Sequence, residues 1–185
     1  ANTTGINNSA VGQQSLLSNT TGCNNVAFGR LALNTNTEGD ENVSVGSCSL
    51  RRSTTADNNT AVGTSALSAN TTGVQNTAIG ADALKANTTA NNNVAVGDDS
   101  LAANTTGTSN VAVGQGAMNT NTEGNCNISI GHRSMDLNTT GSNNTAVGQD
   151  AMRCNTTGTN NVAFGFCSLN CNSTASHNTA IGVEA

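Results

Sequence analysis

The stretch NTTGTNNVAFG at residues 155–165 decides the fold, because near copies of it recur along the whole chain. Two of them are NTTGCNNVAFG at 19–29 and NTTGTSNVAVG at 104–114. A glycine ends each of the eleven copies, and these glycines lie 17 residues apart without an insertion. We number the positions of each repeat as slots 1 to 17, counted from Ala1, and we number the repeats 1 to 11.

Each slot accepts a narrow set of residues. Slot 12 is always Gly, slot 8 is always Asn, slots 10 and 15 hold only Ala or Ser, slot 11 holds only Val, Ile or Phe, and slot 16 holds only Leu or Met. A short fixed period indicates a repeat architecture, and Asn-, Thr- and Gly-rich sequence forms helices poorly. We predict an all-β fold: a parallel β-solenoid (β-roll or β-helix) of eleven 17-residue coils, forming a single domain over residues 1–185.

The pattern within one repeat predicts the parts of a coil. Slots 8–12 (NVAVG) predict a short strand closed by the glycine, and slots 2–4 (NTT) predict a second extended segment. Stacked coils place the same slot ~4.8 Å apart, so eleven coils form a rod roughly 50 Å long. The seventeen charged residues occupy only slots 1, 4, 6, 7, 13, 14 and 17. We therefore interpret the uncharged slots 8–12, 15 and 16 as the packed positions.

The orientation of the predicted strand stays open at this point. Slots 9 and 11 point to one side of a strand, and slots 10 and 12 point to the other. If slots 10 and 12 face inward, the Val, Ile and Phe column of slot 11 faces outward and needs a partner surface, as in a trimer or a lateral bundle. If slot 11 faces inward, the rod can be monomeric. We predict self-association as an end-to-end filament, a lateral bundle or a homotrimer.

Two polar columns are candidates for a structural or a binding role. Stacked amides can donate to one neighbour and accept from the next, so the slot-8 column predicts an asparagine ladder. Its members are Asn8, Asn25, Asn42, Asn59, Asn76, Asn93, Asn110, Asn127, Asn144, Asn161 and Asn178. Slot 3 is a candidate surface Thr array, made of Thr3, Thr20, Thr37, Thr54, Thr71, Thr88, Thr105, Thr122, Thr139 and Thr156.

A regular, uncharged array of Thr or Asn can order water to match ice, which gives an ice-binding interpretation. The ranks that lie together on one side are Asn of slot 2 and Thr of slot 4, and Glu38 and Glu123 interrupt the latter. In the alternative interpretation, Thr serves only as a β-forming residue that holds the stack together.

Eight slot-2 asparagines begin an N-x-[ST] sequon and are candidate N-glycosylation sites. They are Asn2, Asn19, Asn70, Asn87, Asn104, Asn138, Asn155 and Asn172. Glycosylated in a secretory pathway, they would carry a row of sugars. If slot 2 is instead a buried ladder, a glycan has no room there.

The six cysteines yield one predicted disulfide. Cys154 and Cys171 share slot 1 in adjacent repeats, which places their Cα atoms ~4.8 Å apart, within the ~4.4–6.8 Å that a disulfide requires. A bridge between them would imply an oxidising compartment. The alternative is two free thiols that fill a Thr- or Ala-like site. The cysteines without an evident partner are Cys23, Cys48, Cys126 and Cys167.

Composition and motifs exclude several classes of function. Charged residues make up 9% of the chain, the net charge is −5, and the basic residues form no patch, so we expect neither nucleic acid nor an anionic membrane as a partner. No apolar run approaches the ~20 residues of a membrane span. His132 and His177 lie in different slots, and no zinc spacing, phosphate loop or catalytic triad occurs. We predict that the chain is not an enzyme and needs no cofactor.

The repeat also resembles known families. Its core NxAVGxxAL, seen as NTAVGTSAL at 59–67 and NTAIGADAL at 76–84, resembles the head repeats of trimeric autotransporter adhesins, which are left-handed parallel β-rolls that associate as trimers. The longer form NTTGxNNxAVGxxAL is similar to 17-residue arrays in tail-fibre-like and surface proteins of phages, bacteria, algae and their large viruses. The resemblance covers the whole chain.

This resemblance implies a location outside the cell or on a cell or virion surface. Together with the missing catalytic motifs, it predicts an extracellular structural or adhesive module of a fibre, filament or surface adhesin. The first and last repeats lack atypical capping sequence, which favours a stretch of a longer array. The alternative is an ice-binding protein, and the predicted ligands are accordingly surface glycans or ice.

Overall fold

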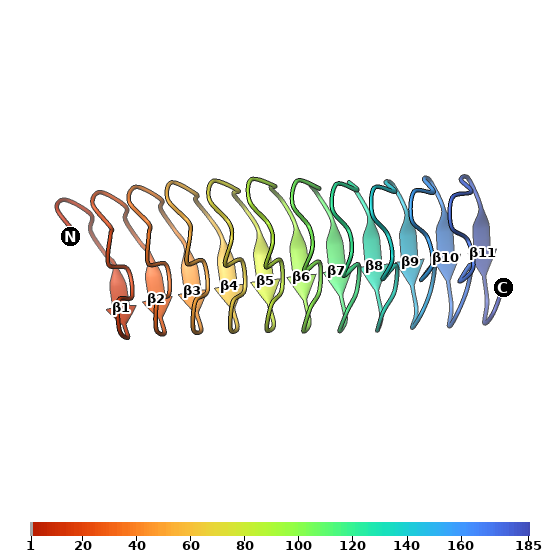
Figure 1. The fold of residues 1–185 in the computed structure, drawn as a ribbon, viewed down its shortest axis with the longest axis horizontal. Helices are drawn as coiled ribbons and strands as arrows, with labels where there is room; N and C mark the ends of the chain where they lie inside the picture. The colour runs from red at the N-terminus through yellow and green to blue at the C-terminus, as the bar shows by residue number, and fades with distance from the viewer. Residues whose placement is uncertain (1) are drawn as a thin grey trace.

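The chain forms a rod of stacked coils, each containing one short strand (Figure 1). The computed structural model describes residues 2–185, so residue 1 of the predicted domain lies outside the described residues. The strands are β1 (Ser9–Val11), β2 (Val26–Phe28), β3 (Val43–Val45), β4 (Thr60–Val62), β5 (Thr77–Ile79), β6 (Val94–Val96), β7 (Val111–Val113), β8 (Ile128–Ile130), β9 (Thr145–Val147), β10 (Val162–Phe164) and β11 (Thr179–Ile181). Residues 2–185 contain no helix. The predicted all-β parallel solenoid with 17-residue coils is confirmed.

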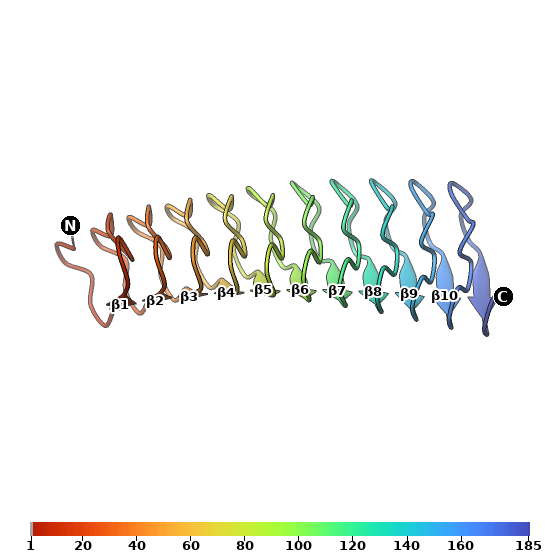
Figure 2. The same cartoon turned by 60° about the horizontal axis from the view of Figure 1, so that its bottom comes forward.

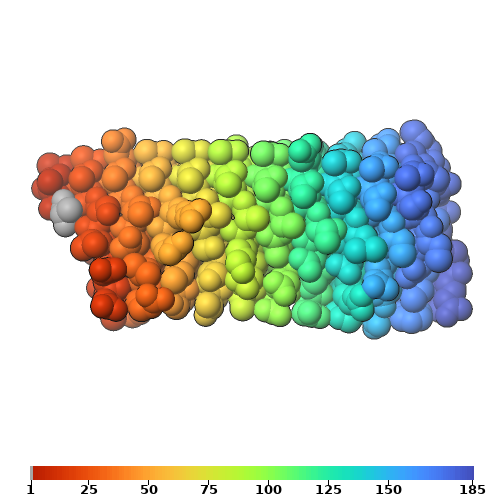
Figure 3. Space-filling model, viewed as in Figure 1, coloured from red at the N-terminus to blue at the C-terminus, as the bar shows by residue number. Residues whose placement is uncertain are grey.

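All eleven strands join one parallel sheet in chain order. Each strand residue pairs with the residue 17 positions later, as Val94 pairs with Val111. Parallel strands need a return connection of about a dozen residues or more, which the rest of each coil provides. The sheet lines one side of the rod, along its lower edge in Figure 2, and the return segments lie above it. The coils follow one another along the rod in chain order (Figure 3).

The core is narrow and consists of three columns. Ala or Ser of slots 10 and 15 and Leu or Met of slot 16 pack between the sheet and the return segment, and Leu101 and Met118 are fully buried. Burying one such side chain contributes about 1.5–3 kcal/mol, whereas ordering the backbone costs about 1–2 kcal/mol for every residue. A single coil is therefore unstable alone, and its neighbours must complete it.

Each of coils 1 to 10 turns tightly because four slots adopt positive φ. In coil 6 these are Asn92 (φ 61°) at slot 7, Gly97 (φ 133°) at slot 12, Asp99 (φ 54°) at slot 14 and Leu101 (φ 49°) at slot 16. The left-handed region costs a residue other than Gly about 1–2 kcal/mol. The stacked neighbours on both sides must hold these residues in place, because the local sequence disfavours the conformation.

The glycine of slot 12 is invariant for two reasons. Gly97 has a φ that side chains rarely adopt, and a Cβ atom on it would lie 2.5 Å from the carbonyl oxygen of Gly114 in the next coil. The backbones of adjacent coils therefore approach each other too closely here for any side chain.

The NTT segment is bent, so the prediction of a second extended segment is wrong. The amides of Thr105, Thr106 and Gly107 all donate to the single carbonyl oxygen of Thr122, at 3.0, 3.1 and 3.3 Å. This convergence of three successive amides on one acceptor requires a bend rather than a strand. Where slot 5 holds Ala90, only Thr88 of that coil donates to the corresponding carbonyl of Thr105, at 3.3 Å. All three amides converge only where slot 5 is Gly in both of the stacked coils.

Candidate functional site

The outer face of the sheet is formed by slots 9 and 11. In β2 to β11 the middle residue, at slot 10, is buried, and the residues on either side of it are half-buried or exposed. Phe28 and Phe164 of slot 11 are 46% and 53% exposed. The structure therefore selects the outward orientation of slot 11, and the interpretation of slots 9 and 11 as packed within the chain is wrong.

This sheet face differs chemically from the other exposed columns. Slots 4, 7 and 13 are exposed in almost every coil, and each contains charged residues. Slot 11 is exposed in seven coils and half-buried in the other four, yet it contains only Val, Ile and Phe. Slot 9 beside it holds Val or Ile in six coils and Thr or Ser in five, so the sheet face is free of charge and its slot-11 column is wholly apolar. A contiguous apolar column of this kind marks an interaction site.

The slot-8 asparagines form a continuous ladder through the interior. The backbone amide and Nδ2 of Asn110 donate to Oδ1 of Asn93 at 3.0 and 3.2 Å, and Nδ2 of Asn110 also donates to the carbonyl of Gly124 at 2.8 Å. The same bond from a backbone amide to the preceding Oδ1 joins every coil from Asn8 to Asn178. The predicted ladder is therefore present, and it joins the coils to one another.

A second ladder runs along slot 2. It is the alternative to glycosylation that the sequence left open. Asn104 donates through Nδ2 to Oδ1 of Asn87 at 3.2 Å and to the carbonyl of Gly107 at 2.9 Å. The ladder is interrupted in coil 4, where slot 2 holds Ser53. As a result Oδ1 of Asn36, in coil 3, is buried without a hydrogen-bond partner.

The eight candidate sequons lie on this slot-2 ladder, which contradicts N-glycosylation at most of them. The fully buried sequon asparagines are Asn19, Asn70, Asn87, Asn104, Asn138 and Asn155. Their Nδ2 atoms, where a glycan would attach, donate hydrogen bonds inside the coil. Of the slot-2 sequons, Asn2 is exposed and Asn172 is half-buried, so at this slot only the two end coils leave any room for a sugar.

The slot-3 threonines do not form the predicted free surface array. In coils 1 to 10 each slot-3 hydroxyl donates to the slot-3 carbonyl of the next coil, as Thr105 does to Thr122 at 3.1 Å. Their hydroxyls are thus used in stacking. The exposed Thr column is slot 4, and the Asn of slot 2 that was expected beside it is buried. The predicted two-rank Asn and Thr face is therefore wrong.

All six cysteines are free thiols in the structure, so the predicted bridge between Cys154 and Cys171 is not formed. The two residues do stack in adjacent coils, because the amide of Cys154 donates to the carbonyl of Asn170, next to Cys171, at 3.0 Å. The Sγ atom of Cys154 contacts Oδ1 of Asn170 at 3.8 Å.

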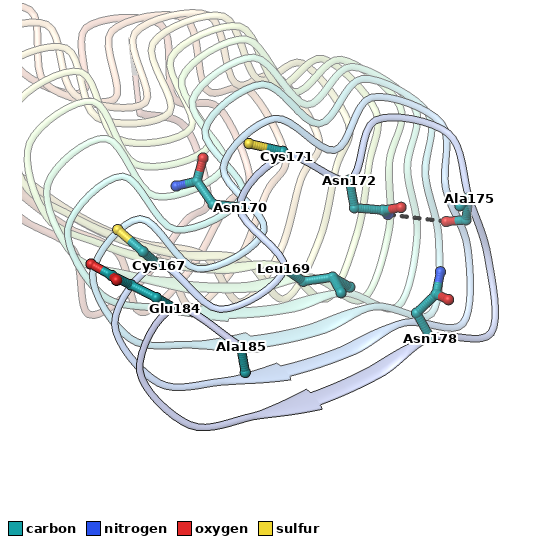
Figure 4. A pocket seen from close by; sticks show the side chains of 9 residues that line it. All are labelled: Cys167, Leu169, Asn170, Cys171, Asn172, Ala175, Asn178, Glu184 and Ala185. Atoms are coloured by element: carbon teal, nitrogen blue, oxygen red, sulfur yellow. Dashed lines mark hydrogen bonds between the residues drawn. The ribbon is translucent and has the colours of Figure 1, made fainter.

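A hollow opens at the last coil, and Figure 4 shows its lining, which includes Cys167, Leu169, Asn178 and Glu184. These side chains belong to columns that the next coil covers along the rest of the rod, so the hollow is the end of the stack rather than a separate site. Partial burial, together with the carboxylates of Asp150 and Glu184, raises the pKa of the Cys167 thiol.

The described residues hold no cluster of metal-ligating side chains. Within residues 2–185 no group of three or more His, Cys, Asp or Glu side chains is placed to bind a metal ion. His132 and His177 are exposed and lie in different columns. The same part of the chain contains no helix of the length and hydrophobicity that a membrane crossing needs. The surface feature with a distinct chemistry is therefore the apolar sheet face.

Comparisons with protein-family models, with curated proteins and with solved structures find no match to this chain.

Proposed function

We propose that the chain is a structural module, a rigid rod that packs side by side with copies of itself through its apolar sheet face, as part of a fibre, filament or surface adhesin. The observation that carries this proposal is the slot-11 column, which faces outward yet excludes polar and charged residues in all eleven coils. Within residues 2–185 no segment lies over this column, and we attribute its composition to a surface outside the chain. A location outside the cell and a glycan ligand stay predictions.

The size of the face is sufficient for a stable contact. With side chains of slots 9 and 11 each showing on the order of 50 Å², eleven coils offer on the order of 1,000 Å², compared with the roughly 800 Å² that each partner buries in a standard interface. A second copy is the occupant that fits best, because its face has the same coil spacing and is equally free of charge.

The test compares two substitutions in coil 6 by analytical ultracentrifugation. Val96→Glu, at slot 11, places a carboxylate in the proposed contact and should abolish association. Thr89→Glu, at slot 4, is the matched control, because slot 4 naturally accepts Glu38 and Glu123. We expect the control to associate like the unaltered chain. An unaltered chain that sediments as a monomer at tens of micromolar would refute the proposal.

Ice binding is the second candidate, supported by the exposed Thr column of slot 4. Within residues 2–185 the hydroxyls of this column donate no hydrogen bond, so they are available to water. A thermal hysteresis measurement separates the two functions. The comparison is between Val96→Glu and a triple variant with Thr72→Glu, Thr89→Glu and Thr106→Glu. Ice binding is favoured over the structural role if the triple variant loses hysteresis and Val96→Glu keeps it.

A further inference from the structure

The sheet face is bordered by two flanks with different charges. We call slots 4–7 the acidic flank, and slots 13, 14, 17 and 1 the mixed flank. Figure 4 shows the last coils in cross-section: Cys167 and Glu184 of slot 14 lie toward one end of the strands, and Ala175 and Asn178 of slots 5 and 8 lie toward the other. Slot 14 and slots 5 and 8 are therefore on opposite sides of the apolar face, whereas Asn170 and Cys171, of slots 17 and 1, lie across the coil from the strand.

The charges are divided unequally between these flanks. All six Lys and Arg residues lie on the mixed flank, and the acidic flank has five carboxylates and no base. Those carboxylates belong to Glu38, Asp40, Glu41, Asp57 and Glu123.

The division is complete in coils 2 to 4. There the mixed flank has Arg30, Arg51 and Arg52 and no carboxylate, while the acidic flank has four of its five carboxylates. None of these seven side chains takes part in an ion pair within residues 2–185. Farther along the rod, by contrast, charges of the mixed flank pair with each other, as Lys85 does with Asp82 at 3.2 Å. Asp40 and Asp57 each accept a backbone amide through Oδ1, from Cys23 at 2.6 Å and from Asp40 at 2.8 Å, but no charge of coils 2 to 4 has an opposite charge beside it in the described residues. Another molecule can supply one.

We infer that copies of the chain pack parallel and in register around an axis that runs along the rod, with Arg30 of one copy against Asp40 and Glu41 of the next. This inference rests on the proposed function, because it assumes that the apolar faces meet. Rotation about the rod axis brings each mixed flank against the neighbour's acidic flank. Rotation about an axis across the rod would make the copies antiparallel and bring like flanks together, and like charges across an interface are strongly unfavourable.

Arg30 and Glu41 are the best placed of these charges. Slot 13 and slot 7 are the exposed columns nearest the sheet face on its two sides, and both residues are exposed. They belong to coils 2 and 3, a step of ~4.8 Å along the rod, which an arginine side chain spans easily. Asp40 of slot 6 directly precedes Glu41, is also exposed and offers a second carboxylate.

Zero-length cross-linking tests the contact directly. In an Arg30→Lys variant, a carbodiimide activates a carboxylate, the introduced amine attacks it, and an amide bond forms as the urea by-product leaves. We expect a product of twice the chain mass in which the peptide containing residue 30 is joined to the peptide containing Asp40 and Glu41. The Lys85–Asp82 pair provides an internal control for the reagent. Cross-links from residue 30 to Asp136 or Asp150 would overturn the inference, because they join like flanks.

Charge reversal tests the energetics. At low salt, Arg30→Glu should raise the dissociation constant of the assembly at least ten-fold, and adding Asp40→Lys and Glu41→Lys should restore it. Asp98→Lys is the control, because it also reverses a charge at slot 13. The slot-7 residues that it would face on the neighbouring copy, in coils 6 and 7, are neutral. We expect less than a two-fold change for this control.

The outcomes separate the two proposals. If the unaltered chain does not associate, the proposed function fails and the inference fails with it. If the chain associates but Arg30→Glu has no more effect than Asp98→Lys, only the parallel arrangement is refuted.

Discussion

Restoring the broken slot-2 ladder should stabilise the protein. Ser53 is the one residue in this column that is not Asn, and Oδ1 of Asn36 is buried beneath it without a partner. On the other side of the gap, Nδ2 of Asn70 donates only to the carbonyl of Gly73, at 2.9 Å. Coil 6, with Asn87 at slot 2 and Ala at slot 5 as in coil 4, shows that an asparagine fits this kind of coil.

The magnitude of the Ser53→Asn effect follows from these contacts. The new Nδ2 would donate to Oδ1 of Asn36 and to the carbonyl of Ala56, and the new Oδ1 would accept from Asn70. Relieving one buried unsatisfied acceptor is worth about 1–3 kcal/mol, and each added hydrogen bond contributes about 1 kcal/mol before side-chain ordering is subtracted. We expect a net stabilisation of about 2 kcal/mol. For a chain of this size that corresponds to a rise in melting temperature of about 4–8 °C.

Two assays are suited to this prediction. Thermal unfolding followed by circular dichroism gives the global shift, and hydrogen exchange of the backbone amides in coils 3 to 5 gives the local one, which a solenoid that unfolds in parts requires. Ser47→Asn is the matched control, because slot 13 accepts many residue types and Ser47 is not among the positive-φ residues, so we expect a change within about 0.5 kcal/mol. In an Asn36→Ala background the gain from Ser53→Asn should shrink. An equal gain at Ser53 and Ser47 would refute the ladder as a source of stability.

Three further predictions concern the turns and the thiols. Gly148→Ala should destabilise the fold by about 3 kcal/mol or more, because the new Cβ would lie 2.5 Å from a carbonyl oxygen of the next coil. Gly116→Ala, whose Cβ would have its nearest neighbour at 3.6 Å, should cost about 1 kcal/mol, and comparable urea midpoints for the two variants would contradict this. Gln75→Gly should stabilise by about 0.5–1 kcal/mol, since Gln75 is exposed at φ 59° and glycine relieves that strain; a lower urea midpoint would show the reverse. Oxidised glutathione should convert the free thiols of Cys154 and Cys171 to a disulfide and be reduced itself to two glutathione thiols, so the intact mass of the chain should fall by two hydrogens. Stable glutathione adducts on both cysteines would argue against the pairing.

Part of the fold could be predicted because its constraints repeat. One asparagine could not predict a ladder, but an asparagine at slot 8 of all eleven repeats does, and the hydrogen bonds between Asn93 and Asn110 show it. The absence of charge from slots 10 and 16 likewise matches their buried position. The same reasoning misplaced slots 9 and 11, because a column of Val, Ile and Thr has the same composition on the outer face of a sheet as against the core.

The amino-acid sequence by itself determined the period, the parallel stacking and the polar ladder, since these depend only on identical residues meeting identical residues. Tertiary structure alone decided which side of the strand faces outward, that the slot-3 hydroxyls are used in stacking, and that Leu101 adopts a left-handed backbone. Those features depend on which carbonyl of the next coil lies within reach of each donor. That distance is set by the path of the whole coil, and no single repeat of the sequence records it.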